Sequence, residues 1–159
     1  MFACNEIKFN YMSEIIPKTE SLIGSRYADA VLECINASMR TIDILMFEWR
    51  WYKDDFSHPI QLINHALVRA VRRGVKVRAI THHADIAKIL RDVGIDAKAW
   101  PLKKLMHAKL IVCDGNAVIM GSHNLTGSAI NTNIENSVLF YDKEIAETKI
   151  KYIDSLWSS

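Results

Sequence analysis

Apolar side chains along this chain follow two spacings, one typical of helices and one typical of strands. Residues 27–37 place apolar side chains three or four positions apart, which predicts a helix, whereas residues 41–51 alternate sides, which predicts a strand. The same criteria predict further helices at 59–74, 84–93 and 143–157, and further strands at 75–80, 96–100, 108–113, 117–120 and 137–141. Helices and strands therefore alternate along most of the chain.

This alternation is typical of an α/β domain. Asp114, Gly115 and Asn116 separate two of the predicted strands, and they indicate a hairpin because Gly and Asn accept the positive φ values that tight turns require. The chain has 159 residues, with no internal repeat and no linker-like segment. We therefore expect a single domain over residues 1–159, built as a mixed central β-sheet flanked by helices.

Composition narrows the class of protein. Half of the residues are hydrophobic (50%) and 24% are charged, which excludes disorder as the dominant state. The formal net charge is only +2, so bulk charge alone does not indicate a nucleic-acid-binding protein. A chain of this size is also too short for a large enzyme with two lobes.

The cysteines and the N-terminal segment indicate the cellular compartment in which the protein is expected. Cys4, Cys34 and Cys113 cannot all pair within the chain, and none belongs to a metal-type or redox-type doublet, so we expect reduced thiols in the cytoplasm. Residues 1–17 carry charged side chains and lack the features of a signal peptide. No window is apolar enough to span a membrane, and no membrane partner is expected. A chain that begins after a removed signal or anchor would look the same.

The strongest motif runs from His107 to Asn124. It contains His107, Lys109, Asp114 and the sequence Gly-Ser-His-Asn ending at Asn124, in the spacing HxKx4Dx6GSxN. Downstream, residues 133–136 read Asn-Ile-Glu-Asn. Both segments resemble the phospholipase D superfamily, whose HKD motif has this spacing and is often followed by Asn-x-Glu. Six residue types at fixed spacings make the match specific.

The residue types suit phosphoryl transfer. His107 and Lys109 are two positions apart on a predicted strand, so both side chains leave the same face and could touch one phosphate. A neutral imidazole can attack phosphorus, while Lys109 and Asn124 can stabilise the phosphoryl oxygens. Ser122 could donate a further hydrogen bond. Asp114 lies an odd number of residues from Lys109 and should face away, so we expect it to orient the motif structurally.

The resemblance adds expectations that the residues alone do not give. It implies that Glu135 holds the second ring nitrogen of the nucleophilic histidine, and that no metal or other cofactor is needed. It also implies a second HKD motif, which this chain lacks, to protonate the leaving oxygen. A symmetric homodimer would supply it as His107 of a second copy, as in the small single-motif nucleases that the sequence resembles most.

Further residues are expected around the phosphate-binding cleft or are expected to lie outside it. Lys103 and Lys104 should lie at its rim, and Trp51 and Tyr52 could stack on bases, although packing in the core is the default for such residues. We expect adjacent His82 and His83 to lie in a loop, with Asp85 capping the next helix, rather than to bind metal. His123 occupies a variable position of the motif, and we expect it to support the site or to be exposed.

Taken together, these features predict a homodimeric, metal-independent phosphodiesterase with a covalent phosphohistidine intermediate. A nuclease acting on DNA or RNA is the leading hypothesis, with no predicted base specificity because the site residues all address phosphate. A phospholipid hydrolase or transferase of the same superfamily is the first alternative. A nucleic-acid-binding dimer that has lost turnover is the second.

Overall fold

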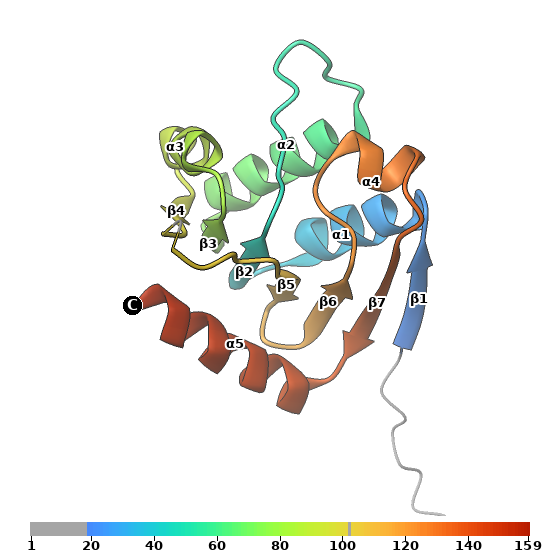
Figure 1. The fold of residues 1–159 in the computed structure, drawn as a ribbon. Helices are drawn as coiled ribbons and strands as arrows, with labels where there is room; N and C mark the ends of the chain where they lie inside the picture. Colours follow the sequence, from blue (N-terminus) through green and yellow to red (C-terminus); the bar gives the residue numbers. More distant parts are fainter. Residues whose placement is uncertain (1–18, 102) are drawn as a thin grey trace, which may run out of the picture.

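The computed structural model describes residues 19–101 and 103–159, which form one seven-stranded sheet with helices on both faces (Figure 1). The elements are β1 (Thr19–Ile23), α1 (Arg26–Ala37), β2 (Thr41–Met46), α2 (Pro59–Arg72), β3 (Lys76–Thr81), α3 (Ala84–Asp92), β4 (Asp96–Ala99), β5 (Lys109–Cys113), β6 (Ala117–Gly121), α4 (Gly127–Asn131), β7 (Asn136–Tyr141) and α5 (Lys143–Trp157). The predicted fold class is confirmed.

The sheet is mixed, with strand order β1-β7-β6-β5-β2-β3-β4. The strands β2, β3 and β4 are parallel, and each further strand from β5 outward to β1 is antiparallel to its neighbour. The predicted β5–β6 hairpin is present, and its turn has positive φ at Gly115, as expected, and at Asp114 rather than at Asn116. The antiparallel strand β5 lies directly beside the parallel strand β2, and this junction positions the candidate site.

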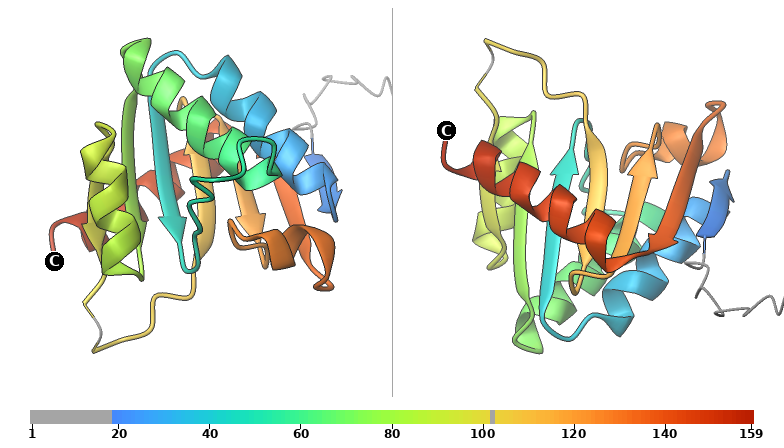
Figure 2. Two further views of the ribbon diagram at one scale, coloured as in Figure 1. Left: turned by 90° about the horizontal axis from the view of Figure 1, so that it is seen from above. Right: turned by 90° about the horizontal axis from the view of Figure 1, so that it is seen from below.

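Two apolar layers cover the faces of the sheet, with α1, α2 and α3 on one face and α5 across the other (Figure 2). Alternate residues of β2 reach each layer: Ile44 packs with the helices of the first face, and Leu45 packs in the cluster beneath α5. The segregation follows from the two-residue period of a strand. Because apolar layers cover both faces of the sheet, the candidate catalytic side chains lie at the ends of the strands.

Three local predictions differ from the structure. The strand expected at 41–51 ends at Met46, because the backbone beyond it bonds to the segment after β6: the Glu48 N–H donates to Oδ1 of Asn124, and Arg50 to the carbonyl of Leu125. Strand β1 was not predicted because only Leu22 among its residues is buried, so it shows no apolar alternation, and the five-residue helix α4 is too short for a helical period.

Only some of the expectations about thiols and the N-terminal segment concern residues that the structure describes. Cys34 and Cys113 are buried free thiols. The expectations for Cys4 and for residues 1–17 lie outside the described residues. Within 19–101 and 103–159, none of the helices has both the length and the apolar character needed to cross a membrane.

Candidate active site

The motif residues gather at one edge of the sheet. Strands β2, β3 and β6 end at this edge, and β5 and β7 begin there, because β5 and β7 run antiparallel to their neighbours. Met46 at the end of β2 pairs with Lys109 at the start of β5, and Gly121 at the end of β6 pairs with Ser137 in β7. Residues that follow β2 and β6 or precede β5 and β7 therefore lie near one another.

His107 and Lys109 form the centre of this edge. His107 is exposed, whereas Lys109 is only 8% exposed, so the lysine stem is packed while the imidazole stays accessible. The Lys109 Nζ lies 3.1 Å from each ring nitrogen of His107 and donates to its carbonyl oxygen at 2.9 Å. Phe47 packs against both, with its ring centre 4.8 Å from that of His107 and 5.1 Å from the ammonium. A phosphate at the exposed imidazole would meet a fixed positive charge.

Burial lowers the pKa of Lys109, and the negative charges of Glu135 and Glu48 act in the opposite direction. The desolvated ammonium has few partners in this chain: its hydrogen bonds among the described residues all go to His107. An anion entering the site would restore the interactions that burial removes.

Asn124 and Ser122 lie at the same edge, just after β6. Oδ1 of Asn124 accepts a hydrogen bond from the Glu48 N–H at 3.1 Å, which fixes the amide and leaves its NH₂ group as the donor. The Ser122 hydroxyl accepts from the Asn136 N–H at 3.0 Å. Gly121 has to be glycine, because a Cβ there would lie 2.3 Å from the Ser137 Oγ and 2.4 Å from the Asn136 carbonyl. This close contact holds the Ser122 backbone against β7.

Among the described residues, Glu135 makes no hydrogen bond to the His107 ring. It precedes β7, which is separated from β5 by β6, so about 10 Å of sheet lies between the two strands. Its carboxylate accepts from the Asn133 amide at 3.0 Å instead. Burial acts to raise the pKa of Glu135, but hydrogen bonds from Ser122 and Asn133 and the nearby positive charges outweigh it, so the pKa falls. Within one chain, Glu135 acts on the site by charge and through Ser122.

Asp114 lies at the opposite edge of the sheet, at the turn between β5 and β6. Its carboxylate accepts three backbone hydrogen bonds, from the N–H groups of Met39, Arg40 and Thr41, at 2.8–2.9 Å. Burial acts to raise its pKa, but these bonds and the Arg40 charge lower it overall. Asp114 thus ties the hairpin to the start of β2, in the structural position that the odd spacing from Lys109 suggested.

The family follows from comparison with known proteins. The model of the family described as "Cardiolipin synthase, PLD-like domain" matches residues 31–157. The chain belongs to the phospholipase D-like family. The matched range includes the whole segment from His107 to Asn136, on which the resemblance was based.

Two relatives of this phospholipase D-like chain carry enzyme names. A phospholipase D of Rickettsia felis is 37% identical over 102 residues, which are 57% of this chain and 48% of the relative. A mitochondrial cardiolipin hydrolase of Xenopus laevis is 33% identical over 148 residues, 89% of this chain and 64% of the relative. The chain thus spans less than two thirds of the length of either relative.

Among solved structures, the phospholipase D family member Nuc from Salmonella typhimurium has a similar fold. The TM-score is 0.74 at 23% sequence identity, and the match covers 89% of this chain and 95% of Nuc. At this level of identity, the similarity concerns the fold, and it agrees with the phospholipase D-like assignment.

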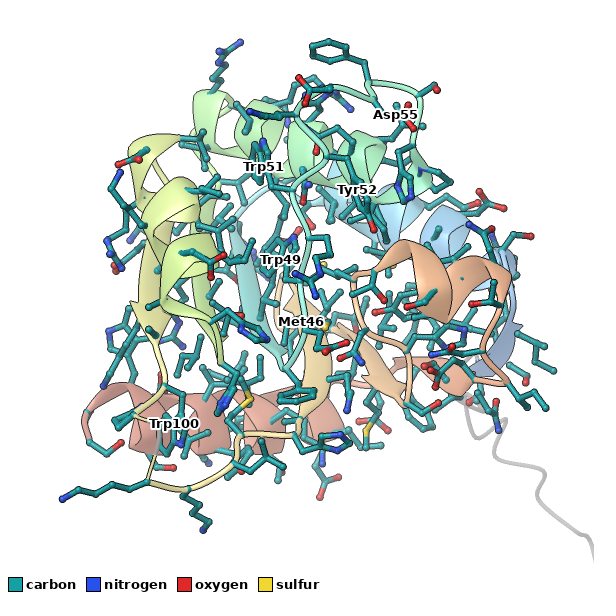
Figure 3. The ribbon with its side chains drawn as sticks, turned by 45° about the horizontal axis from the view of Figure 1, so that its top comes forward. Met46, Trp49, Trp51, Tyr52, Asp55 and Trp100 are labelled. Atoms are coloured by element: carbon teal, nitrogen blue, oxygen red, sulfur yellow. The ribbon has the colours of Figure 1, made fainter. Side chains whose placement is uncertain are left out.

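The rim residues predicted for this phospholipase D-like site divide into two groups. Lys103 and Lys104 are exposed in the segment that leads from β4 to His107. Trp51 and Tyr52 lie on the segment that leaves the end of β2 at Met46 and runs away from the sheet past Trp49 (Figure 3).

The contacts of Trp51 and Tyr52 are structural. Trp51 packs against the core cluster of the first face. Tyr52 stacks on His58 with ring centres 3.7 Å apart, and its hydroxyl accepts from the Gly127 N–H at 2.8 Å. These contacts occupy one face of the Tyr52 ring and its polar end, so they do not favour the expected stacking on bases.

His123 proves to be a buried part of the support beneath the site. Its ring stacks on Tyr27 with centres 4.3 Å apart, and its Nδ1 lies 2.9 Å from the Ser137 hydroxyl. Burial lowers the pKa of His123, and the charge of Glu135 opposes this effect. The supporting role was among the two expected; the sequence carried no signal for the partner Tyr27, which is 96 positions away along the chain.

The loop expected at His82 and His83 is present between β3 and α3. The helix cap is different from the prediction: His83 is the N-cap residue and Asp85 lies in the first turn, where a carboxylate is favoured by the helix dipole. In the described part of the chain, no group of three or more His, Cys, Asp or Glu side chains is arranged to hold a metal ion.

Proposed function

We propose that this phospholipase D-like chain is a phosphodiesterase that cleaves nucleic acid, with His107 as its nucleophile. The observation that carries the proposal is the pairing of an exposed imidazole with the buried Lys109 ammonium, 3.1 Å from its ring nitrogens. Asn124 at the same edge supplies a further donor, its amide NH₂ group. Such donors favour the transition state, in which charge on the phosphoryl oxygens is greatest.

The proposed reaction has two displacements. A ring nitrogen of His107 forms a bond to phosphorus while the bond from phosphorus to the leaving oxygen breaks, and a general acid protonates that oxygen. A water oxygen then bonds to phosphorus, a base takes its proton, and the nitrogen–phosphorus bond breaks. The products are an alcohol and a phosphomonoester, and the imidazole is regenerated. Lys109 and Asn124 hold the phosphoryl oxygens throughout.

We assign the general acid to His107 of a second copy of the chain. Two exposed apolar side chains beside the motif support an interface here: Leu105 is 59% exposed just before His107, and Ile134 is fully exposed just before Glu135. A symmetric interface over this edge would cover both and bring two copies of His107 together. The two copies of Lys103 and Lys104 would add positive charge for a polyanionic strand.

The activity is tested with single-stranded DNA and RNA in the presence of excess EDTA. Wild-type protein should cleave at least one of them, and His107→Asn should reduce kcat by at least ~10³-fold because the nucleophile is lost. His65→Asn is the matched control, since His65 lies on α2 and bonds to Gln61. Loss of cleavage on chelation, or equal cleavage by H107N, would contradict the mechanism.

The shared site is tested by mixing. Wild-type and H107N subunits are refolded together at several ratios, and activity is measured at constant total protein. If each site needs two wild-type histidines, an equal mixture should retain about a quarter of the wild-type activity. A linear dependence on the wild-type fraction, or a monomer in analytical ultracentrifugation, would exclude a site shared between subunits.

A phospholipid diester is the second candidate substrate. The relatives named phospholipase D and cardiolipin hydrolase favour it, and so do the exposed Leu105 and Ile134 if they contact lipid rather than a second subunit. Vesicles containing cardiolipin should be assayed beside the oligonucleotides. Hydrolysis of lipid alone would replace nucleic acid as the substrate, and salt-sensitive binding without turnover would identify a binding protein.

A further inference from the structure

A cavity lies beside the catalytic edge, on the face of the sheet that α5 crosses (Figure 2). Its volume is about 250 Å³, and its lining includes His107 and Lys109 of the motif. Leu110 and Met120, which are paired across β5 and β6, contribute apolar side chains to it. The proposed nucleophile therefore borders a partly apolar space that the motif itself does not explain.

Helix α5 lines the cavity with Lys149 and Tyr152, two residues outside the motif. They are three positions apart and so lie on one face of the helix. Tyr152 is 50% exposed, and its ring has no stacking partner among the described residues. Within the same part of the chain Lys149 has no ion-pair partner, whereas the neighbouring Lys151 pairs with Glu147 at 2.9 Å. An aromatic ring and a positive charge are thus both available to a ligand.

The size and chemistry of the cavity favour one nucleotide as its ligand. Pockets for drug-sized ligands measure about 300–1,000 Å³, so a cavity of about 250 Å³ suits a single ring-sized group better than a long acyl chain. A half-exposed tyrosine ring can stack on any base, since every base has a flat π-face. A lysine ammonium attracts the phosphates of the same strand.

We propose that this cavity binds the nucleotide next to the scissile phosphate, with its base stacked on Tyr152 and its backbone near Lys149. The proposal rests on the proposed nuclease function and deepens it by identifying a substrate-binding subsite. His107 and Lys109 line the same cavity, so a nucleotide in it would be joined directly to the phosphate that they hold. Stacking does not read base edges, so the subsite would bind any base.

The first test uses a labelled single strand in which one nucleotide lacks its base. Wild-type protein cleaves the strand no more than once per molecule, and the rate at each bond is read from the product lengths. A bond beside the abasic nucleotide should be cleaved about tenfold more slowly than the same bond in the intact strand, because stacking is lost. Equal rates would overturn the subsite. No cleavage of the intact strand would contradict the proposed nuclease function itself, which is a distinct outcome.

The second test assigns the effect to Tyr152. The rate at the bond beside the abasic nucleotide is divided by the rate at a distant bond of the same strand, so that a loss of folded protein cancels. This ratio should rise to about one in Tyr152→Ala and stay near one tenth in Tyr152→Phe, which keeps the ring. Lys151→Met, a neighbouring substitution outside the cavity, is the control and should also leave the ratio low. A low ratio in Y152A would contradict the role of Tyr152.

The role of Lys149 is tested by binding. In the H107N background, the affinity for the intact strand is measured by fluorescence anisotropy as a function of salt. Lys149→Met should reduce the slope of log Kd against log salt by about 0.7, the value for one phosphate contact on a single strand. Lys151→Met should change it less, because Lys151 is already paired with Glu147. Equal slopes in K149M and its parent would exclude a phosphate contact by Lys149.

Two other occupants of the cavity would give different results. If it holds part of a lipid, Y152A should lower the hydrolysis of cardiolipin vesicles and leave the pattern of strand cleavage as in wild type. If a second subunit covers it, Y152A should raise the dimer dissociation constant in analytical ultracentrifugation, again with the wild-type cleavage pattern. Either result would replace the nucleotide as the occupant.

Discussion

Replacement of Asp114 by asparagine or alanine tests whether this position of the motif serves the chemistry or the structure. The carboxylate lies about 16 Å along β5 from Lys109, at the far end of the strand. It accepts backbone hydrogen bonds from Met39, Arg40 and Thr41. We therefore expect the substitutions to lower stability while the folded enzyme keeps its turnover.

The magnitude follows from these three bonds. Hydrogen bonds to a charged acceptor contribute about 1.5–3 kcal/mol each when buried, and partial exposure of the turn reduces this to ~1 kcal/mol each. Asp114→Ala should therefore lower the free energy of unfolding by ~3 kcal/mol, with ~1 kcal/mol more because φ is +53° there. Asp114→Asn tolerates this φ and keeps one acceptor oxygen, so we expect a loss of about 1–2 kcal/mol.

Urea unfolding at pH 7 and pH 3, with kcat measured at 25 °C, checks the argument. Because hydrogen bonds hold the pKa of Asp114 below its usual range, the stability from this carboxylate is present above pH ~4 and is lost as pH falls through the lowered pKa. The difference in the free energy of unfolding between wild type and D114N should therefore be smaller at pH 3 than at pH 7. Asp92→Asn, which removes an exposed pair with Lys88, should cost less than ~1 kcal/mol. A D114N protein of wild-type stability with kcat reduced tenfold would refute this reasoning.

Three further substitutions probe the edge that carries the site. Lys109→Met should leave circular dichroism unchanged and reduce kcat at least ~10²-fold, since it removes the charge beside His107; near-normal turnover would contradict its role. Gly121→Ala should lower the free energy of unfolding by about 1–3 kcal/mol, because its Cβ would overlap β7; an unchanged melting temperature would argue against the contact. Tyr52→Phe should cost ~1 kcal/mol by removing the acceptor of the Gly127 N–H, with KM for oligonucleotides unchanged; a raised KM would restore Tyr52 to the substrate site.

The sequence was sufficient to predict the parts of the site that depend on one strand or one hairpin. The two-residue spacing of His107 and Lys109 predicts a shared face, and their ring nitrogens and ammonium do lie together. The turn at Asp114 predicts the β5–β6 hairpin, which brings Ser122 and Asn124 to the edge where β5 begins. In each case the geometry is local, because strand pleat and turn chemistry alone determine it.

Contacts that depend on strand order could not be predicted in this way. A hairpin pairs β5 with β6, but nothing in the sequence places β7, which follows Glu135, on the far side of β6. The approach of His82 to Phe47, with ring centres 5.3 Å apart, likewise requires β3 to pair in parallel with β2, a pairing between segments 35 residues apart. The contact between Tyr52 and Gly127 depends on α4, whose five residues are too few for a recognisable helical period.

The two kinds of group in the proposed site differ in how firmly the chain holds them. Lys109 is packed at a strand end. Asn124 accepts a hydrogen bond from the backbone after β2, and Ser122 accepts one from the backbone at the start of β7, so the proposed phosphate-binding groups are held in place before substrate arrives. His107 is different, because its ring is exposed and its described contacts are Lys109 and Phe47. A nucleophile needs such access on one side for the phosphate. In the proposed mechanism, the second imidazole approaches the leaving oxygen from the opposite side, which is the solvent-facing side of this edge, where the proposed second subunit would bind.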